Sequence, residues 1–450
     1  MKFSFNVKQS AWSHFSFVAS VFLLLYSTLF YIYPVVFNSG AFLYAIGFTF
    51  ILLVFYVSSE QKSFFSPVVF FLVSTIVFVG GRGFLSVVLN FPLIEAGYPS
   101  KRKLEISALF LIVLVVSFML LGYYVSTMLS EKKSPAHTGL ILKIPWFLNF
   151  IFLIFSGLFL TKFFYESYVL IPLISKSDFL EISGTESVMG HINYFFYGKF
   201  LLIPYLFFSD NRKRFLVAAS FLALSSIGFL FIGLRGYFMV YFMLFLFFFN
   251  SFFKINILYL SGVFVAIFFV AAKTIEYRLG YSLYDGFLDL IFKTLHQQGA
   301  SFEVLYGVVA YTDEVRDCMP LREYFSNPGG FGACVDKSRG VFWEYGGFAS
   351  TFFAEIYYLG WLPTIILAGT FGYILKKLER YSILYQSEVI NGSAVGHSGF
   401  ILFLVLPNLL YYGRGGAFDF IYKFLLVFSF IYISSVFLKL FSTKVIGNKV

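Results

Sequence analysis

Long apolar runs, interrupted by short polar segments, follow one another along almost the whole chain. Many runs reach about 18 residues or more, the length that a helix needs to cross the roughly 30 Å hydrocarbon core of a membrane. The pattern predicts an all-α polytopic integral membrane protein with about twelve transmembrane helices. The predicted spans are His14–Phe37, Ala41–Val57, Phe64–Val79, Leu104–Met128, Pro145–Phe164, Tyr194–Phe208, Phe215–Leu234, Tyr237–Phe253, Ile255–Ala272, Ser350–Leu375, Gly396–Tyr412 and Phe418–Leu438.

Two polar segments are longer than the others and divide these runs into groups. Residues 1–272 are predicted to hold the first nine helices, with a loop near 165–193. Residues 273–349 are predicted to form a large loop, and residues 350–450 the last three helices and a tail. Within the large loop, the apolar residues of Tyr281–Gly299 recur at helical spacing. This predicts an amphipathic helix that lies along the membrane interface or packs on the bundle as a lid.

The composition excludes a soluble domain, because 59% of the residues are apolar and only 12% are charged, against about 45–50% and 25% in soluble proteins. The net charge of +10 does not indicate nucleic-acid binding here, since the cations lie in short loops, where they set membrane orientation. Most of these loops share one side if both termini are cytoplasmic, although Ser100–Lys103 ("SKRK") argues against this. In this orientation both long polar segments are outside.

Three arginines stand next to glycine at the predicted outer ends of the third, seventh and eleventh spans. They are Arg82 in "VGGRGF", Arg235 in "IGLRGY" and Arg414 in "YYGRGGAFDF". An arginine at a helix end can simply reach the lipid headgroups. Glycines such as Gly413 and Gly415 favour another interpretation, because they let the backbone approach a ligand closely. Guanidinium and open N–H groups together suit phosphate oxygens, so we predict a diphosphate site.

Three further residues are candidates for the same site. Arg278 follows the ninth span and would either join the phosphate site or anchor the helix. His296, in the amphipathic stretch, is a candidate general base, although a lone histidine is more often structural. Glu355, near the start of the tenth span, would act as the base, orient a sugar hydroxyl or pair with an arginine, because carboxylates within spans usually face a cavity or a partner.

The two cysteines, Cys318 and Cys334, both lie in the large loop. An outer location is oxidising, so we predict that they form a disulfide. The sequence shows no metal-ligand spacing and no nucleotide-binding motif, and we therefore expect no metal site and no cofactor.

The chain resembles the Wzy-type O-antigen polymerases. The resemblance is carried by "GGFASTFFAEIYYLGWLPTIILAG" after a long outer loop, by "IGLRG", "YGRGG" and "LHQQGASFEVL", and by the overall layout. It implies an inverting glycosyltransferase of the bacterial inner membrane that joins undecaprenyl-diphosphate-linked oligosaccharide units on the periplasmic face. It also implies membrane lipid and a chain-length regulator protein as partners. In that mechanism, the four arginines would bind the diphosphate, and His296 or Glu355 would be the base.

Other functions fit parts of the same pattern. A lipid-linked oligosaccharide flippase or another transporter also has about twelve helices with intramembrane arginines, but internally repeated halves are typical of transporters, and none is visible in the sequence. A ligase that moves finished glycan to the lipid core is a second alternative. A non-enzymatic structural or chain-length partner is a third, which the cavity-facing charges argue against.

Overall fold

The computed structural model describes residues 4–34, 37–61, 63, 65–89, 101–130, 146–170, 186–207, 212–231, 235–253, 262, 265–266, 269, 273, 276, 285–299, 301–326, 330–340, 351–390 and 397–411. Every regular element within these residues is a helix. Five helical stretches are long and apolar enough to cross a membrane, namely Phe15–Ile32, Ser39–Ser58, Pro67–Ser86, Arg102–Leu129 and Phe150–Val169. The prediction of a helical, polytopic membrane protein is confirmed. The predicted spans Ile255–Ala272 and Phe418–Leu438 lie largely or wholly outside the described residues.

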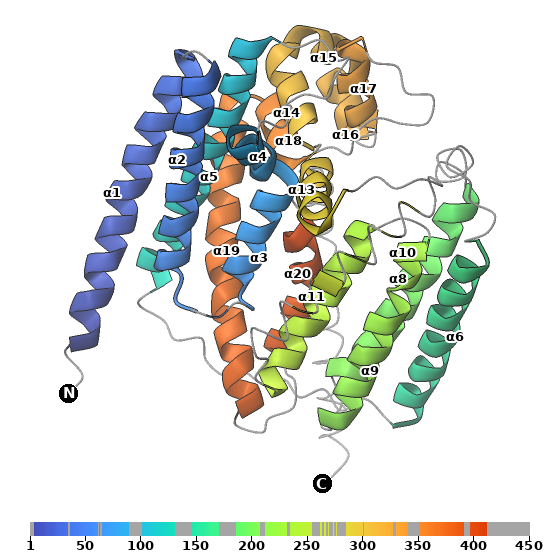
Figure 1. The fold of residues 1–450 in the computed structure, drawn as a ribbon. Helices are drawn as coiled ribbons and strands as arrows, with labels where there is room; N and C mark the ends of the chain where they lie inside the picture. The colour runs from blue at the N-terminus through green and yellow to red at the C-terminus, as the bar shows by residue number, and fades with distance from the viewer. Residues whose placement is uncertain are drawn as a thin grey trace.

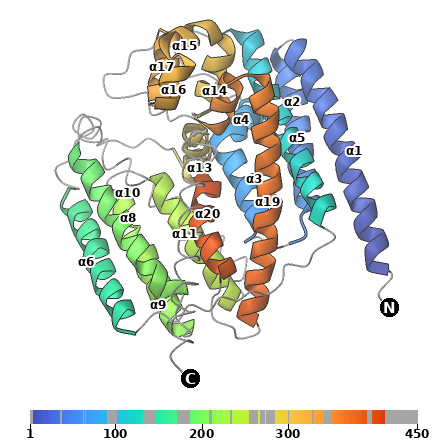
Figure 2. The same ribbon diagram turned by 180° about the vertical axis from the view of Figure 1, so that it is seen from behind.

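The helices form two groups that are joined by two central helices (Figures 1 and 2). The first group consists of α1 (Ser4–Ile32), α2 (Phe37–Ser58), the helix α3–η1–α4 (Pro67–Leu89), α5 (Arg102–Ser130) and α19 (Trp361–Ile390). The second consists of α6 (Trp146–Leu170), α8 (Glu186–Phe207), α9 (Arg212–Ser225) and α10 (Gly228–Phe231). The central helices α11 (Arg235–Phe252) and α20 (His397–Tyr411) contact members of both groups.

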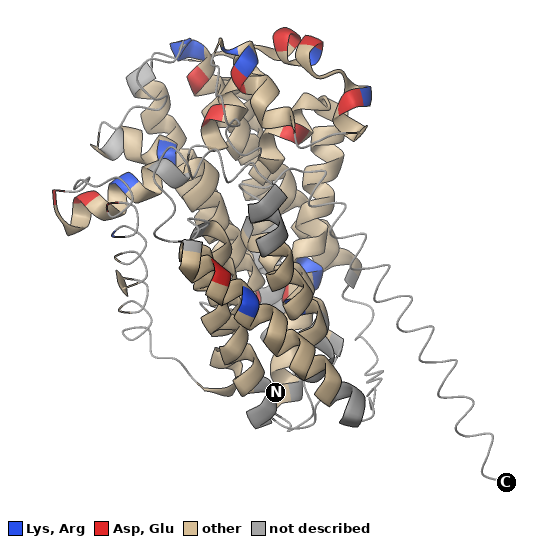
Figure 3. Cartoon of the chain, turned by 90° about the vertical axis from the view of Figure 1, so that its right-hand side faces the viewer, with Lys and Arg blue, Asp and Glu red and all other residues tan. Residues whose placement is uncertain are grey.

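A lobe of short helices covers one end of the first group (Figure 1). We use "lobe" for α14 (Ser301–Ala310), α15 (Thr312–Cys318), α16 (Leu321–Ser326) and α17 (Phe331–Ser338). A disulfide between Cys318 and Cys334 joins α15 to α17, with their Cα atoms 5.9 Å apart. Charged residues gather at this end, whereas the helices below carry few of them (Figure 3). α1 begins at the opposite end of the molecule.

The sequence pattern predicted that the third span ends at Val79, but the helix continues past Arg82. The helix begins at Pro67, passes through one π-helical turn at Ile76–Gly80 and continues to Leu89. Its glycines permit close packing: a Cβ atom on Gly80 would overlap the ring of Phe48, and one on Gly83 would lie 2.5 Å from Leu109. Arg82 therefore lies within a helix rather than beyond its end, and the backbone N–H groups there, which were expected to be open, belong to that helix.

The tenth span is also different, because it consists of two helices. Two residues separate α18 (Phe352–Tyr358) from α19, which begins at Trp361, and one of them, Gly360, has a φ of +109°. Side chains other than glycine rarely adopt that angle. Pro363 lies in the first turn of α19. Backbone N–H groups there have no partner within the helix, so the missing N–H of proline breaks no hydrogen bond. The predicted seventh span is divided as well, into α9 and α10.

The tightest helix pair in the described bundle is α5 with α19. A Cβ atom on Gly122 would overlap the carbonyl oxygen of Gly369, and one on Gly372 would overlap that of Met119. Small residues at such positions let two backbones approach and gain dispersion contacts, which drive helix association in lipid. These glycines fix α19 against α5.

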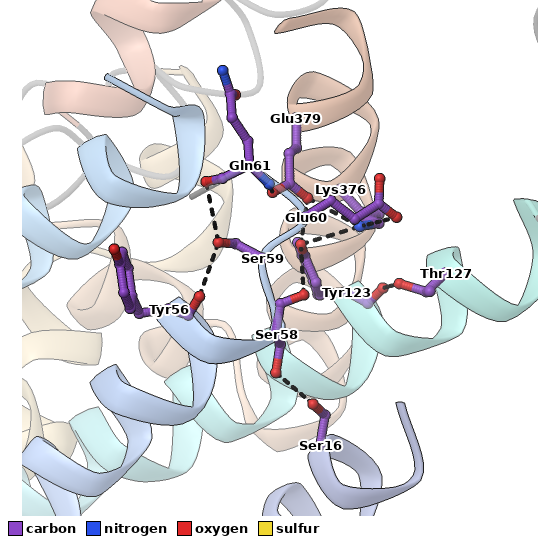
Figure 4. A network of polar contacts seen from close by, with 10 residues as sticks. All are labelled: Ser16, Tyr56, Ser58, Ser59, Glu60, Gln61, Tyr123, Thr127, Lys376 and Glu379. Carbon is purple, nitrogen blue, oxygen red and sulfur yellow. Dashed lines mark hydrogen bonds and ion pairs between the residues drawn. The ribbon is translucent and has the colours of Figure 1, made fainter. Parts of the chain in front are cut away.

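A buried polar network holds three segments of the bundle together (Figure 4). Lys376 of α19 lies 2.7 Å from Glu60 and 3.0 Å from Glu379, and its Nζ donates to the hydroxyl of Tyr123 on α5 at 3.2 Å. Tyr123 donates in turn to Glu379, and the backbone N–H of Gln61 donates to the same carboxylate at 2.9 Å. The network thus ties the α2–α3 connection to α5 and α19.

Candidate functional site

Arg82 points from the bundle into the lobe. Its side chain is fully buried, and its Nη2 lies 2.7 Å from Oε1 of Glu303, which is equally buried. Glu303 belongs to the first turn of α14, where the helix dipole favours a negative charge. This ion pair links the helix α3–η1–α4 to the lobe.

A second arginine shares the same carboxylate. Nη2 of Arg339 donates to Oε2 of Glu303 at 3.1 Å, and its Nη1 lies 3.7 Å from Asp336. Arg339 is the C-terminal cap residue of α17, and its guanidinium lies over the ring of Tyr306, 5.7 Å from the centroid. We call Arg82, Glu303, Asp336 and Arg339 the arginine–glutamate cluster. It contains two positive and two negative groups, all buried, so that each charge compensates another.

Tyr306 connects the cluster to the start of α5. Its hydroxyl accepts a hydrogen bond from the backbone N–H of Lys101 at 2.7 Å, and Nζ of Lys101 donates to the carbonyl of Ala310 at 3.2 Å. Burial raises the pKa of the Tyr306 hydroxyl to about 12, although the Lys101 N–H opposes this shift. The hydroxyl is therefore neutral at physiological pH, and Tyr306 acts here as a hydrogen-bonding and packing group.

The amphipathic helix α13 (Phe287–Gln298) approaches the cluster from the side. It packs against η1 and α4, and a Cβ atom on Gly299 would lie 2.9 Å from the Cβ of Arg82. His296 is partly buried and precedes Gly299 by one helical turn, which places both on neighbouring positions of one face. The hydrogen bond from Lys293 lowers the pKa of Asp289. The structure thus brings the helix that carries His296 to Arg82.

Glu355 is buried in α18 and faces the lobe rather than open solvent. The hydroxyl of Tyr324, on α16, donates a hydrogen bond to its carboxylate. The next turn of α18 is anchored similarly, because Tyr358 donates to the carbonyl oxygen of Met319. Glu355 therefore shares a polar contact with the lobe, and α18 packs against α14, which carries Glu303.

The structure describes little of the other predicted site residues. Arg235 is the first residue of α11, and nothing is described of its side chain. Arg278, Arg414, Gly413 and Gly415 lie outside the described residues. Among the residues that the structure does describe, no group of three histidine, cysteine or acidic side chains could hold a metal ion.

Sequence reasoning missed Glu303, Asp336 and Arg339. A signal existed for Arg339, because Arg339–Gly340 repeats the Arg–Gly pair of the three motifs. Glu303 lies inside "LHQQGASFEVL", which carried part of the resemblance, but no local pattern marks it as the partner of Arg82. The pairing depends on how α14 packs on the end of α3–η1–α4.

Comparison with known proteins assigns the chain to a family. Residues 15–324 match the family described as O-antigen polysaccharide polymerase Wzy. An O-antigen polymerase of Escherichia coli is 33% identical over 281 residues, which cover 62% of this chain and 62% of that protein. The match therefore spans less than two thirds of the relative. No solved structure matches. Because the family match includes Arg82, Glu303 and α13 and extends over more than half of the sequence, the chain belongs to the Wzy family of O-antigen polysaccharide polymerases.

Proposed function

We propose that this protein polymerises undecaprenyl-diphosphate-linked oligosaccharide repeat units into long polysaccharide, as an O-antigen polymerase. The observation that carries the proposal is the family match over residues 15–324. The name of the E. coli relative agrees with it.

The protein acts in the bacterial inner membrane, with about twelve spans, both termini in the cytoplasm and the lobe in the periplasm. The position of the first residues of α1, at the end opposite the lobe, supports this orientation (Figure 1). So does the excess of Lys and Arg in the loops assigned to the cytoplasm. A chain-length regulator protein is the expected protein partner.

The reaction transfers a growing chain from one lipid carrier to an incoming unit. A hydroxyl oxygen of the incoming unit attacks the anomeric carbon of the donor from the face opposite the diphosphate. The new C–O bond forms as the bond to the diphosphate oxygen breaks, which inverts the anomeric centre. The diphosphate leaves with the electron pair, and the hydroxyl proton passes to a base. Fixed guanidinium groups stabilise the negative charge that develops on the leaving group.

Arg82, Arg235, Arg278 and Arg414 bind the diphosphate in this proposal, and Gly413 and Gly415 allow its close approach. Arg82 enters the site already held by Glu303 at 2.7 Å, so that its position is fixed before substrate arrives. Such preorganisation avoids a reorganisation cost during the reaction.

His296 and Glu355 are the two candidates for the base. The packing of α13 on α4 supports His296, because it brings its helix to Arg82. The position of Glu355 supports the second candidate, since its carboxylate is buried where α18 meets the lobe. The hydroxyl of Tyr324 donates a hydrogen bond to this carboxylate. That hydrogen bond would have to break before Glu355 could reach a substrate hydroxyl.

The function is tested in a bacterial strain that lacks this chain and is complemented with variants. We expect Arg235→Ala and Arg414→Ala to leave surface lipopolysaccharide that carries single repeat units. Arg322→Ala is the matched control, because Arg322 is exposed on α16. It should restore long chains.

The repeat units found on the lipopolysaccharide and on the lipid carrier of these strains separate the competing functions. Loss of all repeat units would indicate a flippase, and long chains that remain on the lipid carrier would indicate a ligase. Unchanged long chains in both arginine variants would refute the proposed site. Unchanged long chains in the deletion strain itself would refute the function.

A further inference from the structure

Three consecutive cations lead into α5 at the end of the molecule that carries the lobe. They are Lys101, Arg102 and Lys103, and all three are exposed. The sequence pattern did not explain them, because in the proposed orientation they lie outside, where short membrane loops carry few cations. The apolar stretch that is long enough to cross a membrane begins at Arg102, so the three cations stand at the membrane boundary.

The two lysines keep their positive charge available to a ligand. Nζ of Lys101 donates to the carbonyl oxygen of Ala310 at 3.2 Å and lies over a tyrosine ring of the lobe, and both of these partners are neutral. Within the part of the chain that the structure describes, neither Lys101 nor Lys103 belongs to an ion pair. Arg102 differs, because it interacts electrostatically with the buried Glu105 one turn along α5.

An aromatic cluster lies beside the cationic segment. The hydroxyls of Tyr31 on α1 and Tyr357 on α18 are 2.7 Å apart, and the ring of Trp361 on α19 meets both rings edge-on, with centroids 5.3 and 5.5 Å away. Ser107 of α5 joins the cluster to the cations, because its hydroxyl donates to the carbonyl oxygen of Tyr31 at 3.1 Å and lies 3.4 Å from that of Lys103. Tyrosine and tryptophan favour this level of a membrane, where one end of the ring is apolar and the other meets water.

Farther from the cations, the helices that carry Tyr31 and Trp361 present apolar side chains on the surface. Leu25 and Leu29 of α1 and Ile365 and Ile366 of α19 are all exposed. From the boundary inward, the surface thus offers exposed cations, then aromatic rings with hydroxyls, then aliphatic side chains. A phospholipid presents its groups in the matching order, from phosphate through glycerol esters to acyl chains.

The position of this surface favours a membrane lipid over the carrier-linked substrate. α1 lies at the outer edge of the first helix group, on the side turned away from the second group (Figures 1 and 2). α13, which carries a candidate base, and the central helix α11 lie on the other side of the first group. A lipid on α1 and α19 is therefore separated from the proposed diphosphate site.

We propose that the segment Lys101–Lys103 binds the phosphate of an anionic phospholipid whose acyl chains lie on the exposed faces of α1 and α19. Charge complementarity selects this occupant, because lysines at a membrane surface attract anionic headgroups and ammonium groups donate charge-assisted hydrogen bonds to phosphate oxygens. Lys101 can serve the lobe and the lipid together, since an ammonium has three N–H donors. The bound lipid would hold the lobe at the membrane surface. Such a lipid site goes beyond the proposed function and does not depend on it.

The test measures lipid retention by the purified full-length chain in native mass spectrometry, with phosphatidylglycerol as the anionic probe and phosphatidylethanolamine as the zwitterionic one. We expect wild type to retain phosphatidylglycerol in preference, and Lys103→Gln to weaken its binding by about fivefold. Trp361→Leu keeps the site apolar but removes an aromatic ring, and it should weaken binding by about threefold. Equal retention of the two lipids by wild type would overturn the proposal.

A second lysine beside an aromatic ring supplies the matched control. Lys162 on α6 is half-exposed and its Nζ lies 4.3 Å from the ring centroid of Tyr194, but it also lies 3.7 Å from Glu166. Because that carboxylate offsets its charge, Lys162→Gln should bind phosphatidylglycerol within about twofold of wild type. Equal losses in Lys162→Gln and Lys103→Gln would show unspecific attraction to surface charge and overturn the site.

Two further arms keep the result decisive. The double variant Lys101→Gln/Lys103→Gln should lose roughly twentyfold, and if it does not assemble because Lys101 also bonds the lobe, the single variant at the exposed Lys103 carries the test. Undecaprenyl diphosphate that displaces phosphatidylglycerol and itself depends on Lys103 would assign the surface to the substrate and overturn the phospholipid. A chain that retains phosphatidylglycerol here but restores no long surface chains would contradict the proposed function alone.

Discussion

Glu303 places one carboxylate oxygen 2.7 Å from Nη2 of Arg82 and the other 3.1 Å from Nη2 of Arg339. One acidic residue of the lobe thereby joins an arginine of the bundle to an arginine of the lobe. All three side chains are fully buried. The geometry suggests that Arg82 has a structural task in addition to any contact with substrate.

Glu303→Ala should destabilise the protein severely. The change leaves two guanidinium groups buried without their shared carboxylate, and breaking a buried ion pair in this way costs about 3–5 kcal/mol. The measurement is thermal unfolding in detergent, with Glu323→Ala as the control, because Glu323 is exposed on α16. Equal stability of the two variants would show that the cluster contributes little to stability.

The double variant Arg82→Met/Glu303→Met separates structure from substrate binding at this pair. Replacing Arg82 as well removes one of the two buried guanidinium groups that Glu303→Met leaves without their shared carboxylate, so we expect the double variant to be more stable than Glu303→Met alone. Surface polysaccharide should nevertheless remain at single repeat units, because the guanidinium is missing. Long chains in the double variant would show that Arg82 serves structure alone.

His296→Asn and Glu355→Gln decide which residue is the base. Loss of a general base lowers the rate by about 10²–10⁴-fold without changing substrate affinity in proportion. Initial rates with purified lipid-linked units give kcat and KM for each variant. The base variant should lose kcat, whereas a variant at a merely structural position should lose thermal stability in parallel with activity. Full activity of both variants would remove both candidates.

Gly372→Ala should impair assembly of the bundle. The added methyl group would overlap the carbonyl oxygen of Met119, and overpacking typically costs about 1–3 kcal/mol. Gly157→Ala is the matched control, since a Cβ atom there meets nothing within 4 Å. Fluorescence-detected size-exclusion chromatography after heating compares the two. A Gly372→Ala protein as stable as the control would show that α5 and α19 separate easily.

Glu379→Ala and Glu60→Ala should differ although both remove a carboxylate partner of Lys376. The side chain of Glu379 is completely buried, whereas that of Glu60 is 29% exposed. Loss of Glu379 should therefore cost about 3–5 kcal/mol, and loss of Glu60 about 1 kcal/mol or less. Thermal unfolding of both variants measures the difference. Equal losses would mean that burial does not set the strength of this network (Figure 4).

Much of the fold was predictable because hydrocarbon imposes a simple rule. A chain in lipid must satisfy its backbone hydrogen bonds within each helix, so long apolar runs such as Arg102–Leu129 determine membrane helices by themselves. The amphipathic helix α13 (Phe287–Gln298) lies within Tyr281–Gly299, where the apolar spacing predicted a helix. The resemblance carried by the motifs and the overall layout also indicated the correct family.

The roles of individual residues were decided by tertiary packing. Glycines next to Arg82 suggested open backbone N–H groups for phosphate, but they lie in a helix, where they allow Phe48 and Leu109 to pack closely. Gly360 divided one apolar run into two helices because it adopts a positive φ. Nothing near Arg82 in the sequence indicates Glu303. The sequence by itself determined which segments enter the membrane, because that depends on local hydrophobicity. Only the tertiary structure decided which charges meet, because buried ion pairs form between segments that are distant along the chain.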